Sequence, residues 1–416
     1  MEKPIEWNCL EPSSEVHNML STNITEKLLG LKEVIIKKEE NINGIYKATI
    51  ELPRKAHLCP CCGQETDCVH DYRLQPAKDI PAFGMQVILL YRKRRYRCKA
   101  CGKCFYEKNT FLPHYHRMTS RLVAYVIDRL RDIYSFTSIA NQVNLSVSTV
   151  IRIFDIVNYG KPVLGNVLGI DEFKGNTGKE KYQCILTDPE NGWVLDVLPD
   201  RFFHNLAAYF KDLNRFNTSF VVSDMWKPYA DIFGTYFKTA KHVLDRYHIM
   251  RQVEWAFEAV RKEEQKKFSK SHRIYFKHSR FLLLKPFDSL SNEQKQEVNV
   301  MLYASPNLSS AYYLKESFCK LSRIKDAVLL RQELSSWILH AQNSSIPRFH
   351  QCADTFILWA PEILNAFTLP YSNGFTEGCN NKIKVLKRNT YGYRNFFRFR
   401  NRILHVFSQQ NAALSS

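Results

Sequence analysis

The sequence predicts a multidomain α/β protein, and three observations support this fold class. Seven of the twelve cysteines fall between Cys59 and Cys104, and such clustering indicates a small metal-binding module. Residues 163–250 alternate apolar strand patterns with helical ones, whereas residues 251–370 have an almost wholly helical pattern. A chain of 416 residues is long enough to build several domains with their own cores.

We expect six segments in chain order. They are an N-terminal lead-in with a β-hairpin (1–56), a cysteine-rich module (57–116), a helical domain (117–160), the first part of an α/β core (163–250), an all-helical insertion (251–370) and a C-terminal helix that returns to the core (371–416). The hairpin is predicted because KEVIIKKEENINGIYKATIEL alternates polar and apolar residues around Asn43-Gly44, a dipeptide typical of hairpin turns.

The cysteine-rich module contains two similar knuckles, CPCCG at 59–63 and CKACG at 98–102. Each pairs cysteines at C-x-x-C spacing and ends in glycine, which relieves the tight turn that points backbone amides at thiolate sulfurs. The module is therefore predicted to be a zinc ribbon with one structural Zn²⁺, and a strand pair in 79–97 can span the long interval between the knuckles. The predicted zinc ligands are Cys59, Cys62, Cys98 and Cys101.

Three cysteines of the module, Cys61, Cys68 and Cys104, are left outside this ligand set. Cys101 and Cys104 form a competing C-x-x-C pair, but phenylalanine rather than glycine follows Cys104. The alternative interpretation of the whole module is a cluster of free buried thiols.

Residues 136–157, FTSIANQVNLSVSTVIRIFDIV, predict two short helices joined by a turn at Asn144-Leu145. Ser146 or Ser148 can cap the second helix, and Ala140 allows the helices to cross closely. This pattern is typical of a helix-turn-helix, whose second helix enters a major groove. An ordinary helical hairpin that packs a core is the alternative. The outward-facing candidates for DNA contact are Ser148, Thr149 and Arg152.

The α/β core is expected to start at Val167. The predicted elements are a strand in LGIDEF, strands at 182–186 and 193–198, a helix at 202–213, and strands at 220–223 and 241–244. Three hairpin-linked strands followed by a helix and a crossover strand describe an RNase H-like mixed sheet. In that topology the first and fourth strands are neighbours.

Three carboxylates stand out in this arrangement. Asp171 and Asp224 come where buried strands are expected to stop, and Glu377 opens a helix in SNGFTEGCNNKIKVLKR. Three negative oxygen donors at one place suit a pair of divalent metal ions for phosphoryl chemistry. Taken singly, each acid has an ordinary structural explanation as a turn or first-turn residue. Glu172 is expected to point to the opposite face of the strand.

The charge distribution indicates an anionic partner. The formal net charge is +18, and residues 91–108 and 377–402 each hold eight Lys or Arg against one Glu. No stretch is apolar for long enough to span a bilayer, and the N-terminus lacks a secretory pattern, so we expect a cytoplasmic protein with no membrane partner. Four basic residues that follow Glu377 are predicted to contact phosphates, and the alternative is a solvated basic face. They are Lys382, Lys384, Lys387 and Arg388.

The chain contains, in this order, the zinc ribbon, the helix-turn-helix, GIDEF, SDMWKPY, the helical insertion and SNGFTEGCNNKIK. A chain with this order resembles the bacterial insertion-sequence transposases of the ISL3 family, a branch of the DDE transposases. The resemblance covers nearly the whole chain from about residue 57. It implies that Asp171, Asp224 and Glu377 form the catalytic triad. Asp245-Arg246-Tyr247-His248 is similar to a C/D-x-x-H element of related transposases, although a lone histidine is more often structural.

The resemblance implies a DNA transposase that binds terminal inverted repeats, cleaves DNA at the element ends with two Mg²⁺ or Mn²⁺ ions, and joins the 3′ ends to target DNA. Its partners would be double-stranded DNA and further copies of the chain in a dimer or larger assembly, at the bacterial nucleoid. Two alternatives are a non-enzymatic DNA-binding regulator and a domesticated, inactive transposase.

Overall fold

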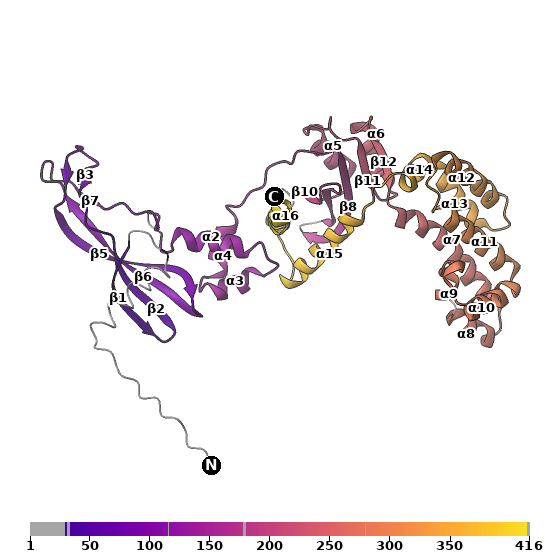
Figure 1. Cartoon of the computed structure of the whole chain (residues 1–416), viewed down its shortest axis with the longest axis horizontal. Coiled ribbons are helices and arrows are strands. Elements are labelled where there is room, and N and C mark those ends of the chain that lie inside the picture. Colours follow the sequence, from indigo (N-terminus) through magenta and orange to yellow (C-terminus); the bar gives the residue numbers. More distant parts are fainter. Residues whose placement is uncertain (1–29, 31–33, 115, 178–179, 279, 414–416) are drawn as a thin grey trace, which may run out of the picture. The chain divides into compact units, whose positions relative to one another are not determined.

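The computed structural model describes residue 30 and residues 34–114, 116–177, 180–278 and 280–413. The chain divides into two compact units, Met1–Val157 and Asn158–Ser416, and each is described by itself (Figure 1). Most of the expected N-terminal lead-in lies outside the described residues. Within the described part, no helix has the length and apolar character needed to cross a bilayer.

The first unit is built on a sheet with the strand order β1-β2-β6-β5 and β7 added to β6. Its strands are β1 (Ile35–Ile42), β2 (Ile45–Glu51), β5 (Val69–Ala82), β6 (Met85–Arg97) and β7 (Cys104–Tyr106), and a separate pair is formed by β3 (His57–Leu58) and β4 (Glu65–Thr66). The hairpin predicted at Asn43-Gly44 is confirmed, with both residues at positive φ. The strand pair predicted in 79–97 is also confirmed, but β5 starts ten residues earlier than expected.

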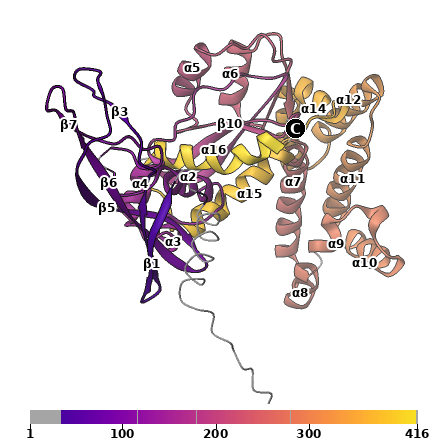
Figure 2. The ribbon, with the colours of Figure 1, turned by 60° about the vertical axis from the view of Figure 1, so that its left-hand side comes forward.

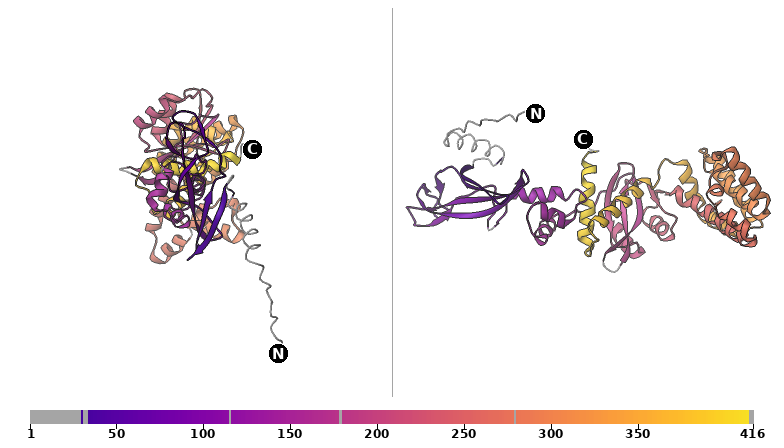
Figure 3. Two further views of the ribbon diagram at one scale, coloured as in Figure 1. Left: turned by 90° about the vertical axis from the view of Figure 1, so that its left-hand side faces the viewer. Right: turned by 90° about the horizontal axis from the view of Figure 1, so that it is seen from below.

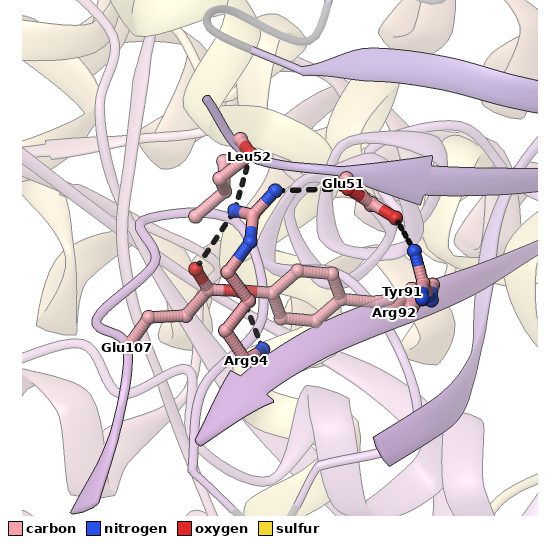
Figure 4. Close-up of polar contacts among 6 residues, drawn as sticks. All are labelled: Glu51, Leu52, Tyr91, Arg92, Arg94 and Glu107. Atoms are coloured by element: carbon pink, nitrogen blue, oxygen red, sulfur yellow. Dashed lines mark hydrogen bonds and ion pairs between the residues drawn. The ribbon is translucent and has the colours of Figure 1, made fainter. Parts of the chain in front are cut away.

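One arginine of the basic segment 91–108 is internal rather than available to a partner (Figure 4). Arg94 is buried, and its guanidinium lies 2.8 Å from Glu51 and 3.3 Å from Glu107. Tyr91 also donates to Glu107, at 2.7 Å. Burying a guanidinium is tolerated only when carboxylates compensate its charge. Part of this basic segment therefore belongs to an internal network, and Arg94 is not available to an anionic partner.

Three helices follow in the first unit: α2 (Ser120–Arg129), α3 (Phe136–Gln142) and α4 (Val147–Phe154). The turn between α3 and α4 places Asn144 at φ 51°, and Ser146, rather than Ser148, caps α4 by accepting from the Thr149 N–H. The helices are fastened to the sheet, because Thr119 donates to Asp79 at 2.6 Å and the Lys78 ammonium donates to the Asn144 carbonyl at 2.5 Å.

The second unit contains a five-stranded mixed sheet in the order β10-β9-β8-β11-β12. Its strands are β8 (Val167–Thr177), β9 (Glu180–Asp188), β10 (Trp193–Leu198), β11 (Phe220–Ser223) and β12 (Lys241–Leu244). The first three are antiparallel, whereas β11 runs parallel to both β8 and β12. The predicted neighbourhood of the first and fourth strands is therefore confirmed. Helices α5 (Phe203–Lys211) and α6 (Lys227–Tyr236) pack on one face of this sheet.

The expectation that a strand stops at Asp171 was wrong. Strand β8 continues to Thr177, since alternate residues Phe173, Gly175 and Thr177 stay buried and pairing with β9 goes on. Asp171 thus lies in the middle of a strand, while Asp224 directly follows β11 as predicted.

The insertion is helical, as expected, throughout its described residues. Its helices are α7 (Arg246–Lys267), α8 (Lys270–His278), α9 (Arg280–Leu284), α10 (Asn292–Tyr303), α11 (Pro306–Leu321), α12 (Ala327–Gln342), α13 (Pro347–Leu358) and α14 (Ala360–Thr368), with a 3₁₀ turn at Phe287–Ser289. Helices α7 and α11 pack side by side (Figure 2). Because α7 begins at Arg246, the boundary expected after residue 250 falls inside a helix.

The C-terminal segment forms two helices, α15 (Gly374–Asn389) and α16 (Phe396–Ala413), where a single helix was expected. Tyr391 and Gly392 both have positive φ, and this backbone conformation ends α15 and separates it from α16. Helix α16, the yellow helix that lies beside the sheet in Figure 3, packs against β10. This contact is fixed by the Arg400 guanidinium, which donates to buried Asp196 at 2.6 Å.

Helix α15 approaches the sheet closely at Gly169. A Cβ at this position would lie 2.5 Å from Thr187 Oγ1 and 3.0 Å from Thr376 Oγ1. The two threonine hydroxyls are themselves hydrogen bonded at 2.8 Å, across β9 and the first turn of α15. The glycine of GIDEF therefore sets the distance between the strand that carries Asp171 and the helix that carries Glu377.

We predict that Gly169→Ala pushes α15 away from the sheet and destabilises the second unit by about 1–3 kcal/mol, the usual effect of overpacking. Gly234→Ala in α6 is the matched control, because its Cβ would meet nothing within 4 Å. Denaturant unfolding of both full-length variants measures the difference. Equal stability of the two variants would contradict the close approach of α15.

Candidate active site and cysteine cluster

The strand register aligns three aspartates at one edge of the sheet. Strands β11 and β8 pair Val222 with Gly169, so continuing two residues along each strand brings Asp224 opposite Asp171. Strands β11 and β12 pair Ser223 with Leu244, so the next residues are Asp224 and Asp245. Since neighbouring strands are about 4.8 Å apart, the row Asp171–Asp224–Asp245 follows from backbone pairing alone.

Asp171 faces α15. Its Oδ2 accepts a hydrogen bond from Asn380 Nδ2 at 2.8 Å, and its Oδ1 accepts from the Glu172 N–H at 2.7 Å. Burial, together with the nearby charge of Asp224, raises the pKa of Asp171 to about 7. The surroundings of Asp171 therefore disfavour an uncompensated negative charge and favour the binding of a proton or a cation to this carboxylate.

Asp224 is crowded by more charges than Asp171. Burial first, and then the charges of Asp245 and Glu172, raise the pKa of Asp224 to about 7, while a hydrogen bond from the Asn373 side chain opposes the shift. His248 Nε2, in the first turn of α7, lies 3.1 Å from Asp224 Oδ2. Asp245 itself caps α7 by accepting from the Tyr247 N–H at 2.9 Å.

Glu377 lies in the first turn of α15 and is exposed. Its charge contributes to the raised pKa of Asp224, so the two carboxylates are close enough to interact. The three acids are nevertheless not drawn into a tight cluster. Among the described residues, the four module cysteines are the group whose ligand atoms all lie within 4.8 Å of one another.

The residues around the acids fit a hard divalent cation. Asn373 and Asn380 are buried, and the side-chain oxygen of each has no hydrogen-bond partner among the described residues. The amide nitrogen of Asn380 donates to Asp171 at 2.8 Å, and the Asn373 side chain is hydrogen bonded to Asp224. Carboxylate and amide oxygens are the donors that Mg²⁺ and related ions prefer. The donor set thus suits such a cation better than zinc.

The Glu172 side chain lies on the opposite face of β8, as expected, although its charge still contributes to the raised pKa of both aspartates. Its carboxylate forms an ion pair with Arg201, and Tyr229 of α6 donates to it at 3.3 Å. The side chains of Asp171 and Glu172, adjacent in β8, therefore lie on opposite faces of the sheet.

The four basic residues predicted to contact phosphates on α15 are not equivalent. Lys384 and Arg388 are exposed and share a helical face with Glu377. Lys382 is half-buried with its ammonium 4.7 Å from the Phe407 ring centre, and Lys387 donates to the Lys174 carbonyl at 2.5 Å. Lys384 also donates to the Asn381 side chain, at 3.2 Å, so three of the four side chains have a partner within the chain.

The cysteine cluster has the geometry predicted from the two knuckles. The Sγ atoms of Cys59, Cys62, Cys98 and Cys101 all lie within 4.8 Å of one another. Gly63 and Gly102 have the same φ of 73°, and each knuckle closes with the same hydrogen bond, from the glycine N–H to the first cysteine carbonyl at 2.9 Å. Hydrogen bonds from backbone N–H groups, led by that of Cys62, lower the pKa of Cys59 to about 7. The cluster therefore supports a structural Zn²⁺.

On α4, the three candidates for DNA contact differ in exposure. Ser148 and Arg152 are exposed, and Thr149 is half-buried. Arg152 donates to the Thr149 hydroxyl at 3.3 Å, and Ser148 shares a 3.0 Å hydrogen bond with Ser146. The side chain of Arg152 remains on the surface, where a partner can reach it.

Sequence reasoning missed two residues at the acid cluster. Asn373 and Asn380 flank Glu377 on α15, and Asn380 sits one turn after it in EGCNN. The i, i+3 spacing places Asn380 near Glu377 on the helix surface, which was a usable signal. Sequence reasoning also gave Asp245 and His248 little weight, because their position depends on the register of β12.

Comparisons with known proteins agree with this architecture. A transposase family model, the DDE domain of family ISL3, matches residues 168–403. Residues 55–101 match the zinc-finger of transposase IS204/IS1001/IS1096/IS1165, and residues 107–156 match the helix-turn-helix domain of transposase family ISL3.

Two of the individual relatives are transposases as well. The transposase for insertion sequence element IS1001 of Bordetella parapertussis is 28% identical over 82% of this chain and 86% of its own length. The transposase for insertion sequence element IS1557 of Mycobacterium tuberculosis is 24% identical over 55% of this chain and 56% of its own. An ATP-dependent protease of Lactococcus lactis is 38% identical, but over only 26% of this chain and 33% of that protein.

We predict that the cysteine cluster stabilises the first unit through bound zinc. Cys62→Ser should abolish zinc binding and expose residues 57–116 to amide exchange, because a structural zinc supplies much of the folding energy of so small a module. Cys61→Ser is the matched control, since this neighbouring cysteine lies outside the cluster. Elemental analysis and hydrogen exchange measure both effects. Full zinc content in the Cys62 variant would refute the assigned ligand.

The crowded aspartates predict a pH dependence in metal-free protein. The pKa of Asp171 and of Asp224 is about 7 in the folded state against 3.8 ordinarily, so the folded state binds more protons than the unfolded state between these values. Stability should therefore fall as pH rises through this window. Asp224→Asn should raise the thermal midpoint at about pH 8 and change it little at about pH 4.

Thermal unfolding in EDTA, with exposed Asp212→Asn as the control, tests this dependence. Added Mg²⁺ at about pH 8 should stabilise the wild type more than the Asp224 variant. A variant that is less stable than the wild type at that pH would show that Asp224 is not under electrostatic strain.

Proposed function

The chain belongs to transposase family ISL3, and from this membership we propose that it cleaves DNA at the ends of its insertion sequence and joins the freed 3′ ends to target DNA. The proposed catalytic residues are Asp171, Asp224 and Glu377, on an RNase H-like core. One observation carries the proposal: the strand register aligns Asp224 with Asp171, and Glu377 lies near enough to Asp224 to affect its pKa.

The half-buried aspartates Asp171 and Asp224, together with Glu377, would hold the catalytic cations. Asp171 and Asp224 provide the negative charge and Glu377 adds a third carboxylate, so the donors offered to a cation are carboxylate oxygens, with Asn373 and Asn380 hydrogen bonded to the two aspartates. When bound, two Mg²⁺ ions supply a water of lowered pKa and neutralise charge on the leaving oxygen. Asn380 orients Asp171 through its 2.8 Å hydrogen bond, and this contact fixes one carboxylate oxygen for the reaction.

His248 has a defined place in this proposal. Its Nε2 lies 3.1 Å from Asp224 Oδ2, so it orients that carboxylate and can hold a proton beside it. The capping of α7 by Asp245 fixes the helix turn from which His248 extends. We therefore propose a positioning role for this pair, in addition to the three catalytic carboxylates.

The DNA contacts are proposed on both units. Ser148, Thr149 and Arg152 on α4 would read the terminal repeats in a major groove, and the zinc ribbon would add further contacts. On α15, the exposed Lys384 and Arg388 would bind phosphates near the cut. Lys382 and Lys387 would contribute mainly long-range positive potential, because their ammonium groups already have neighbours within the chain. Pairing two element ends calls for a dimer or larger assembly.

Two alternatives use parts of the same structure. A DNA-binding regulator needs only the zinc ribbon and the helix-turn-helix, and it leaves the aligned acids without a role. A domesticated, inactive transposase would keep the fold without the reaction. Cleavage of a labelled end fragment in Mn²⁺ separates both from the proposed enzyme.

We predict that Asp171→Asn, Asp224→Asn and Glu377→Gln each abolish cleavage and strand transfer while end binding survives. Each change keeps side-chain shape but removes a negative ligand, so the loss should exceed the roughly 10- to 100-fold caused by losing an outer partner of a metal site. The substrate is a labelled duplex that carries the inverted repeat expected to flank the coding region.

Glu172→Gln is the control for this series, because its carboxylate serves the opposite face of β8. It should retain cleavage. Activity that persists in any of the three variants, or an equal loss in the control, would place the active site elsewhere.

A further inference from the structure

A shallow pocket of about 490 Å³ lies beside the end of α15, between the β8–β9 hairpin and the connection to α16. Its size falls within the range of about 300–1,000 Å³ that is typical of ligand sites. The lining residues that matter here are Asn176, Lys387, Arg388, Tyr391, Gly392 and Arg394. None of the candidate catalytic carboxylates lines this pocket, so it is a separate feature of the second unit.

The pocket is strongly basic. Lys387, Arg388 and Arg394 line it, and no carboxylate does. Arg388 and Arg394 form no ion pair with any residue in the described part of the chain. Two arginines that converge on one hollow without an acidic neighbour favour an anionic ligand, and a planar guanidinium can bind phosphate with two hydrogen bonds.

The most unusual residue of the pocket is Tyr391. Helix α15 ends in a Schellman motif, in which the Tyr391 N–H donates to the Arg388 carbonyl at 3.1 Å and the Gly392 N–H donates to the Lys387 carbonyl at 3.0 Å. Tyr391 takes the left-handed position of this motif, with φ 56°, where glycine is usual. Its side chain is 99% exposed, so packing within the unit does not explain a bulky residue in a strained conformation.

We propose that this pocket binds an unpaired nucleotide of the DNA substrate, with the Tyr391 ring stacked on the base and Arg388 and Arg394 bound to flanking phosphates. An exposed aromatic ring beside cations is the combination that binds single-stranded nucleic acid. A base within a duplex offers its faces only to its neighbours in the stack, so the ring needs a base that has left the helix. The inference rests on the proposed function, because it takes DNA as the substrate.

Helix geometry fixes how far this nucleotide lies from the cut. Arg388 follows Glu377 by eleven residues on the same helix, which corresponds to about 16 Å along the axis. At 3.4 Å per nucleotide of a strand, the pocket is about five steps from the acids. The unpaired nucleotide would therefore belong to DNA that is opened next to the cleavage site.

Binding of a short fluorescent oligothymidylate to the full-length protein tests the proposal without metal or cleavage. Tyr391→Ala should weaken the affinity roughly 5- to 150-fold, the range for one base stacked on an aromatic ring. Tyr391→Phe should bind like the wild type, since it keeps the ring. Tyr303→Ala, which removes a tyrosine that is 93% exposed on α10, is the matched control and should have no effect.

Tyr391→Gly separates binding from folding. Glycine relieves the left-handed conformation, so this variant should have an unchanged or higher thermal midpoint and still bind the oligonucleotide as weakly as Tyr391→Ala. Photo-crosslinking of a bromodeoxyuridine-substituted oligothymidylate should map to the pocket in the wild type.

Wild-type affinity in Tyr391→Ala, or an equal loss in Tyr391→Phe, would overturn base stacking at this site. Crosslinks confined to other parts of the chain would overturn the pocket itself. If Tyr391→Ala weakened the binding of duplex DNA and of oligothymidylate equally, the site would be a phosphate clamp, and the preference for an unpaired base would likewise be overturned. The proposed function fails by a different result, namely the absence of metal-dependent cleavage of end fragments by a protein that still binds the oligonucleotide.

Discussion

The second unit depends on the crowding of carboxylates at one edge of its sheet. Parallel pairing of β8, β11 and β12 aligns Asp171, Asp224 and Asp245, and burial prevents water from screening them fully. The pKa of two of these acids is raised to about 7 as a result. A well-folded core with such a feature is less stable than it would be with neutral residues there. Either protons or cations must relieve the repulsion, so the site is built to bind positive charge.

The helical insertion is part of the framework that places this site. It starts at Arg246, directly after Asp245, and the Arg246 guanidinium donates to the carbonyls of Ala366 and Leu369 at 2.5 and 2.6 Å, at the end of α14. The chain therefore leaves the sheet and returns to it at nearly the same point. Sheet residues Val222 and Val243 share one apolar core with the insertion. Because α15 follows immediately, a change in the packing of the insertion would move Glu377 relative to the aspartates.

The parts of the fold that follow local rules could be predicted from the sequence. Glycine after each C-x-x-C pair, the Asn43-Gly44 turn and the strands at 220–223 and 241–244 each have a local signal, and the structure contains them all. The central position of Asp171 in β8 was not predictable from the sequence. The residues after Asp171 are partly polar, and they stay in the strand because they keep pairing with β9. The intrachain contacts of Lys382 and Lys387 and the burial of Arg94 depend on distant elements. Tertiary packing decides which members of a basic run stay free.

In the first unit, the paired strands β5 and β6 fill the long sequence interval between the two cysteine knuckles and give it a fixed length. The knuckles lie at one end of the β5–β6 hairpin, where Cys98 directly follows β6, and the helix-turn-helix is fastened near the other end, where Asn144 donates to Gln86 and accepts from Lys78. From Gln86 to Arg97 a strand spans about 36 Å. A single paired hairpin therefore holds the cysteine knuckles and the helix-turn-helix at a fixed spacing, which a flexible linker between two small modules would not maintain.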